Sequence, residues 1–78
     1  MVKIEDLPRT AYEIAHIYRG GVLIEAQVRA VDLHKMLDGK RVKGTDRQGQ
    51  PFYTDLACFF ATKAEAEAAA AKDMGDMV

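Results

Sequence analysis

Side chains that commonly carry catalysis are few in this chain of 78 residues, which contains two histidines, one cysteine and no serine. His16 and His34 have no neighbours at the spacing of metal ligands, so we expect no metal site. His16 faces Glu25 across a predicted hairpin, and an imidazole beside a carboxylate in that position is most simply a surface pair. Cys58 has apolar neighbours on both sides, a setting that keeps a thiol unreactive, so we expect it to pack in the core.

The remaining polar residues form no recognisable catalytic pattern. The carboxylates are scattered along the chain and make no acid–base pair. Gly39, Gly44 and Gly49 resemble turn positions, because no Gly-Lys-Ser/Thr follows them as it would in a phosphate-binding loop. The sequence therefore predicts a protein that is not an enzyme and holds no cofactor.

Charge is distributed unevenly along the chain, although the formal net charge is only −1. One loop is basic and the C-terminal segment is acidic. Such a loop could contact a phosphate backbone or an acidic protein surface. In the alternative interpretation it is a solvated hairpin end, whose charge prevents pairing with another chain. The basic side chains of this loop are Lys40, Arg41, Lys43 and Arg47.

These side chains need elements to position them, and the clearest element is a β-hairpin over residues 11–31. Gly20 and Gly21 separate two strand-like runs, and glycine adopts the positive φ that tight hairpin turns require. A two-residue loop sets the register and makes one face mostly apolar. The predicted pairs are Arg19 with Val22, Ile17 with Ile24, Ala15 with Ala26, and Glu13 with Val28.

The opposite face of this hairpin mixes aromatic and polar groups, as a contact surface would. Tyrosine and arginine are the residue types most often found as binding hot spots. Tyr12, Tyr18 and Arg29 are therefore candidate partner-binding residues, together with the four cations of the basic loop. If a helix covers this face instead, these residues belong to the core.

The flanking segments complete a small α+β fold. Leu7-Pro8 ends an extended arm over residues 1–10, since proline keeps its predecessor out of the helical region. Residues 32–38 fit a short helical turn followed by Gly39. Residues 40–60 form a second hairpin and strand region, in which Pro51 marks an edge strand.

A C-terminal helix over residues 62–74 packs on this antiparallel sheet. Thr62 and Glu65 have the spacing of a capping box, and the alanine-rich run that follows has high helix propensity. Ala64, Ala68 and Ala71 share one face and are small enough to let the helix approach a sheet closely.

A rival interpretation is a winged helix-turn-helix. Residues 10–19 and 23–38 also show helical spacing, and residues 40–53 would then form a wing carrying Lys43 and Arg47. Two features favour the sheet. Residues 1–9 are too short and too interrupted for the required first helix, and the proposed recognition helix carries carboxylates that would repel phosphates.

Composition predicts one small domain over residues 1–78. Eight alanines after residue 56 add little buried area, so self-association into a homo-oligomer is one way to complete the core. A single cysteine and no leader sequence predict a cytoplasmic protein, and no apolar run is long enough for a membrane span.

The segment Phe59-Phe60-Ala61-Thr62-Lys63-Ala64-Glu65-Ala66-Glu67 resembles the ending of many small phage and mobile-element accessory proteins, among them anti-CRISPR inhibitors. The resemblance implies a non-enzymatic protein-binding module that blocks a partner by steric occupation of its surface, since the chain is not acidic enough to mimic DNA. The alternative is a small DNA-binding transcriptional regulator, either a winged helix-turn-helix or a β-sheet reader. There the basic loop would contact nucleic acid.

Overall fold

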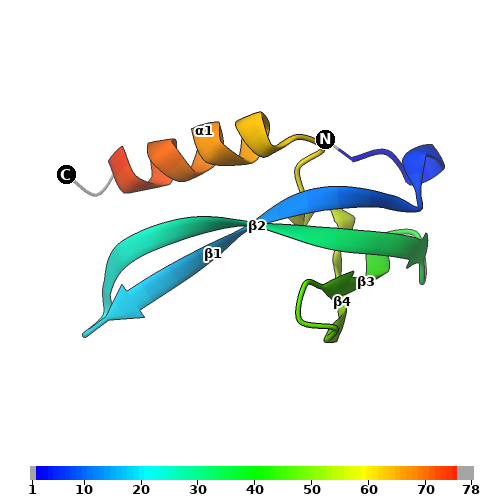
Figure 1. Cartoon of the computed structure of the whole chain (residues 1–78), viewed down its shortest axis with the longest axis horizontal. Helices are drawn as coiled ribbons and strands as arrows, with labels where there is room; N and C mark the ends of the chain where they lie inside the picture. Colours follow the sequence, from blue (N-terminus) through cyan, green and yellow to red (C-terminus); the bar gives the residue numbers. More distant parts are fainter. Residues whose placement is uncertain (1, 76–78) are drawn as a thin grey trace.

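The computed structural model describes residues 2–75 and has the predicted α+β fold, a curled antiparallel sheet with one C-terminal helix (Figure 1). The strands follow one another in the sheet in chain order, β1-β2-β3-β4. Two short 3-10 turns, η1 and η2, precede β1 and follow β4. The elements are η1 (Ile4–Asp6), β1 (Arg9–Arg19), β2 (Val22–Met36), β3 (Arg41–Asp46), β4 (Pro51–Asp55), η2 (Leu56–Cys58) and α1 (Lys63–Gly75).

The first hairpin turns at the predicted glycines, and its register then departs from prediction. Gly20 and Gly21 have φ of 59° and 80°, and Arg19 pairs with Val22 as expected. A β-bulge follows, because Ile24 is an extra residue in β2 between the partners of Tyr18 and Ile17. Every later pair is therefore shifted by one, and the predicted pairs beyond the first are wrong. The observed pairs include Ile17 with Glu25, Ala15 with Gln27, and Glu13 with Arg29.

The sheet curls until its last segment reaches β1 again. The Tyr12 N–H donates to the Phe60 carbonyl at 3.0 Å, and the Phe60 N–H donates to the Tyr12 carbonyl at 2.8 Å. This isolated bridge closes the curl around one hydrophobic core. The buried residues of that core are Val2, Ala11, Val31, Leu33, Val42 and Phe59.

Gly44 is part of this core, so its interpretation as a turn residue is wrong. It lies buried within β3, opposite Phe52 of β4. A Cβ at this position would collide with Cζ of the Phe52 ring and lie 2.6 Å from its Cε1 and 2.7 Å from the Asp32 carbonyl oxygen. The missing side chain lets the Phe52 ring lie over β3 and stack on Phe59, with ring centroids 5.4 Å apart.

Three further expectations fail at the front of the chain. Residues 1–10 are not simply an extended arm, because Ile4–Asp6 form a 3-10 turn and β1 already begins at Arg9. Residues 32–36 continue β2 instead of forming a helical turn. The winged-helix interpretation is also wrong, since both of its proposed helices fall in β1 and β2. Alternating burial along β2, with Val31 and Leu33 inside, outweighs the local helical spacing.

The predicted C-terminal helix is present, but it buries a different face. The Thr62 hydroxyl accepts from the Glu65 N–H at 3.2 Å, as an N-cap does. Ala66 and Ala70 are the buried residues of α1, whereas Ala64, Ala68 and Ala71 are exposed. Alanines occur on several faces of this helix, so composition alone could not select the one that packs on the sheet.

Asp38 organises the connection between β2 and β3. Its Oδ1 accepts from the Lys40 and Arg41 N–H groups at 2.8 Å each, and its Oδ2 accepts from Arg41 Nε at 3.1 Å. The backbone hydrogen bonds, that of Arg41 first, lower the pKa of Asp38 from its ordinary 3.8 to about 2. The carboxylate form of Asp38 therefore favours the folded state.

We expect the Gly44→Ala variant to lose about 1–3 kcal/mol of unfolding free energy, because an added methyl group has no room beside the fixed Asp32 carbonyl. Urea denaturation followed by circular dichroism measures this loss. Gly39→Ala is the matched control, since a Cβ at Gly39 meets no atom within 4 Å. Equal stability of the two variants would contradict the tight packing at Gly44.

We expect Asp38 to contribute to acid sensitivity. Its pKa is lower in the folded chain, so its stabilising contribution is complete above 3.8 and is lost as the pH falls from 3.8 toward about 2. The Asp38→Asn variant cannot titrate, so its unfolding free energy should fall less steeply than that of the wild type over this range. Identical slopes in urea titrations at several pH values would contradict this role.

Candidate functional site

The first hairpin extends well beyond the rest of the sheet (Figure 1). The strand β3 pairs only with residues 31–36 of β2, and Phe60 meets β1 only at Tyr12. We call residues 13–19 and 22–30, with their turn, the distal hairpin. Within the described chain no strand pairs with either outer edge of the distal hairpin. It is therefore a two-stranded ribbon, an arrangement that is only marginally stable without support.

The helix α1 supports one face of this ribbon (Figure 1). His16 Nε2 lies 3.0 Å from Asp73 Oδ2 and fastens β1 to the last turns of the helix. Ala26 and Val28 of β2 line a groove of about 410 Å³ together with α1, which contributes Lys63, Glu67, Ala70, Ala71 and Met74. His16 is opposite Ala26, so the predicted pairing of His16 with Glu25 is wrong.

The helix does not cover the other face of the ribbon, where β2 presents polar side chains opposite Glu13, Ala15 and Ile17 of β1. Arg29 donates to Gln27 at 3.1 Å, and Gln27 donates to Glu25 at the same distance. These three side chains alternate along β2 and form a row on the surface away from the helix. The row contains one cation, Arg29, and one carboxylate, Glu25, on either side of the neutral Gln27, so it has no net charge.

Large apolar side chains are exposed at the end of the distal hairpin. Tyr18 is 62% exposed, Val22 is 56% exposed and Ile24, the bulged residue, is 44% exposed. They come from both strands and surround the Gly-Gly turn. Clustered exposed apolar groups mark interaction surfaces more often than scattered ones do. The hairpin tip, defined as Tyr18, Val22 and Ile24, is therefore the leading candidate for a contact site.

The structure separates the three candidates that sequence analysis placed on one hairpin face. Tyr12 is half-buried beside Phe60, about 20 Å along β1 from the exposed Tyr18. Arg29 pairs with Glu13 on the opposite face, not with Tyr12. Only Tyr18 belongs to the hairpin tip.

The basic loop is also divided. Lys40 and Arg41 lie at the start of β3, and Arg47 lies beyond its other end. Lys40 Nζ is 3.4 Å from Asp55 Oδ2, Arg41 Nη2 is 3.1 Å from Asp38 Oδ2, and Arg47 Nη1 is 3.7 Å from Asp32 Oδ2. Carboxylates thus neutralise three of the four cations, so the loop offers no continuous positive surface.

Lys43 differs from the other three cations because no ion pair within residues 2–75 involves it. It lies between Lys35 of β2 and Tyr53 of β4 in the sheet. Tyr53 is 56% exposed, so these residues form a small row of two cations and one aromatic ring across the sheet.

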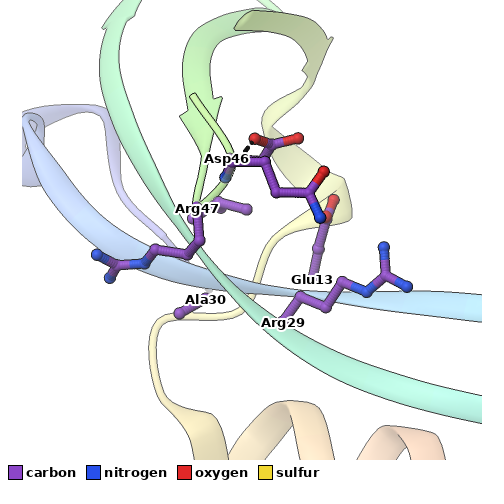
Figure 2. A pocket seen from close by; sticks show the side chains of 7 residues that line it. Glu13, Arg29, Ala30, Asp46 and Arg47 are labelled. Atoms are coloured by element: carbon purple, nitrogen blue, oxygen red, sulfur yellow. Dashed lines mark hydrogen bonds between the residues drawn. The ribbon is translucent and has the colours of Figure 1, made fainter. Parts of the chain in front are cut away.

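A pocket of about 330 Å³ lies between the hairpin and the β3–β4 turn, lined by both acidic and basic groups (Figure 2). The Asp46 carboxylate accepts from the Gln48 and Gln50 N–H groups at 2.9 Å each and so holds the turn. Arg47 is paired with Asp32. The two charged groups of the turn therefore already serve the fold, and the other charged side chains that line the pocket are Glu13 and Arg29 of the hairpin.

Cys58 is exposed, so its assignment to the core is wrong. Cys58 is the last residue of η2, which follows β4. The next residue, Phe59, is the one that packs in the core. Among residues 2–75, no group of three or more histidine, cysteine or acidic side chains could hold a metal ion.

Sequence analysis placed Val22 and Ile24 on the apolar face and so missed them as site residues. A signal was available in the lengths of the elements. The predicted helix over residues 62–74 spans about 20 Å, whereas each strand of the predicted hairpin over residues 11–31 spans about 30 Å. One helix therefore cannot cover the whole hairpin, and its tip remains exposed.

Within the described residues, no helix is long and apolar enough to cross a membrane. No protein family matches the chain, and no curated protein or solved structure matches it either.

Proposed function

We propose that this protein is a non-enzymatic protein-binding module whose contact surface is the distal hairpin. The observation that carries the proposal is the exposed hairpin tip on a ribbon with two unpaired edges. Exposed apolar groups bind by leaving water, and an unpaired strand edge offers backbone hydrogen bonds to an added strand. Both interactions suit a protein partner.

The narrower role suggested by residues 59–67 remains part of this proposal. A projecting ribbon of this kind could occupy a partner's surface sterically, as the resemblance to anti-CRISPR and other phage accessory proteins implies. A cytoplasmic location likewise remains a prediction from the single cysteine. In this function the hairpin tip replaces the basic loop as the main contact.

A second candidate, a β-sheet that binds nucleic acid, is favoured by one observation. Lys35 and Lys43 lie directly opposite each other, and like charges in this position are destabilising unless an anion is bound. The neighbouring Tyr53 offers a ring on which a base could stack. This row is small compared with the hairpin tip, and it contains no arginine that could bind a phosphate through two N–H groups. We therefore place this candidate second.

We expect the double variant Val22→Asp/Ile24→Asp to lose about tenfold or more of the protein partner captured by the immobilised wild type, because charge at the tip prevents its desolvation. Quantitative mass spectrometry of captured proteins measures the loss. Gln48→Asp, an exposed change in the β3–β4 turn, is the matched control and should capture as the wild type does. Equal capture by all three proteins would remove the hairpin tip from the function.

We expect little binding to a labelled random duplex or single strand at low salt, measured by fluorescence anisotropy. Binding that falls steeply with added salt, and that Lys35→Glu/Lys43→Glu abolishes, would support the nucleic-acid candidate instead, because phosphate contacts release counterions. The double variant must keep the wild-type circular dichroism spectrum for this comparison.

A further inference from the structure

We propose that the partner of the distal hairpin is a second copy of this chain, joined through the free edge of β1. The two β1 strands pair antiparallel about a twofold axis at His16. This inference rests on the proposed function, since it assigns the protein partner of the same surface.

The direction of the backbone groups along β1 restricts how another strand can bind. The Tyr12 N–H and carbonyl point outward, because both bond to Phe60. Backbone groups alternate in direction along a strand, so those of Ile14, His16 and Tyr18 also point outward. An antiparallel partner strand must therefore place its own outward-pointing residues opposite these three.

The free part of β1 has a natural centre. Phe60 occupies the edge at Tyr12 and the strand ends at Arg19, so residues 13–19 are free and His16 is their midpoint. A twofold axis at His16 brings Ile14 opposite Tyr18 of the second copy. It is the one symmetric register that uses every free position, and it satisfies the outward hydrogen-bonding groups of all three residues.

This register also matches the side chains. Ile14 meets Tyr18 of the second copy and Ala15 meets Ile17, so apolar groups face apolar groups, and the 62% exposed Tyr18 gains a cover. Glu13 of each copy meets Arg19 of the other, so the symmetric pair contains this contact twice. Neither Glu13 nor Arg19 has an ion pair within the described protomer, in contrast to the paired cations of the basic loop.

The β1 edge is more suitable for pairing than the free edge of β2. The bulge at Ile24 interrupts β2, and a bulge disrupts a regular ladder, whereas β1 contains no extra residue. Residues 13–19 also lack the lysine and proline that commonly protect an edge. The helix lies more over β2 than over β1, which leaves this edge accessible.

The proposed pairing makes one continuous sheet from the two protomers. Cross-strand partners direct their side chains to the same face, so both helices lie on the same side of the joined sheet. The His16–Asp73 contact of each protomer then lies next to the axis. Two marginal ribbons become the centre of a wider sheet, which is the way a small core gains stability by association.

Charge reversal tests the register. In its own homodimer, Arg19→Glu places two carboxylates opposite each other, and Glu13→Lys places two cations opposite each other. We expect each variant alone to dissociate with a constant raised by about tenfold, and an equimolar mixture to form a heterodimer that is stronger than either variant homodimer. In that heterodimer one of the two symmetry-related contacts joins the new lysine to the new glutamate, and the other restores the original pair of Glu13 with Arg19. Sedimentation velocity and native mass spectrometry measure these constants, with Gln48→Glu as the control charge change.

Disulfide cross-linking tests the axis. A hydrogen-bonded antiparallel pair has Cα atoms about 5.5 Å apart, within disulfide range. His16→Cys in a Cys58→Ala background should therefore form a cross-linked dimer under mild oxidation, while Gln48→Cys in the same background should not. Circular dichroism of the reduced variants checks that they fold.

A wild type that remains monomeric at high micromolar concentration would overturn the self-pairing. So would a variant mixture that associates no better than each variant alone. Retained capture of another protein, lost in Val22→Asp/Ile24→Asp, would then preserve the proposed function while excluding the second copy. If the wild type neither associates with itself nor captures another protein through the hairpin tip, the proposed function is removed as well.

Discussion

The two backbone hydrogen bonds between Tyr12 and Phe60 are the constraint on which the rest of the structure depends. They close the curled sheet around the core and so divide β1 into a covered part and a free part. They also fix where the chain leaves the sheet. Because Thr62 caps the helix only two residues after Phe60, α1 begins near Tyr12, and from there it runs along the distal hairpin (Figure 1). The start of the helix and the extent of the free edge of β1 thus both follow from the bridge between Tyr12 and Phe60.

The helix stabilises the ribbon through close approach rather than through large side chains. Ala66 has no exposed surface and Ala70 is 7% exposed, so the helix backbone lies near β2. Alanine loses little entropy on packing, but it also buries little apolar area. The support is therefore modest, and the exposed His16–Asp73 pair adds a directional contact where the helix ends. A ribbon held in this way retains exposed apolar side chains at its tip and unpaired backbone groups along its edges.

Local chemistry was sufficient to predict the turns and the C-terminal helix, but not the register of the first hairpin or the continuation of β2 through residues 32–36. Positive φ at Gly20 and Gly21, the turn at Gly49 and the Thr62 cap each depend on a few neighbouring residues, and the structure contains all three. The Gly-Gly turn by itself predicts a regular register, so no local pattern records the bulge at Ile24. One extra residue changes the face of every later β2 side chain relative to β1, and so Arg29 is separated from Tyr12. Val22 lies before the bulge, and its exposure follows instead from the short reach of the helix.

The same bulge makes the two edges of the hairpin differ in how well they suit pairing with a further strand. An extra residue on β2 strengthens the local twist and breaks the spacing of its outward groups, whereas β1 opposite remains regular. The irregular strand is thereby unsuited to adding a further strand, and the regular strand keeps a continuous row of donors and acceptors. Proteins commonly use bulges to protect edges. Here the protection falls on one edge only, and the other edge carries Glu13 and Arg19 at its two ends, spaced so that a strand of identical sequence complements it.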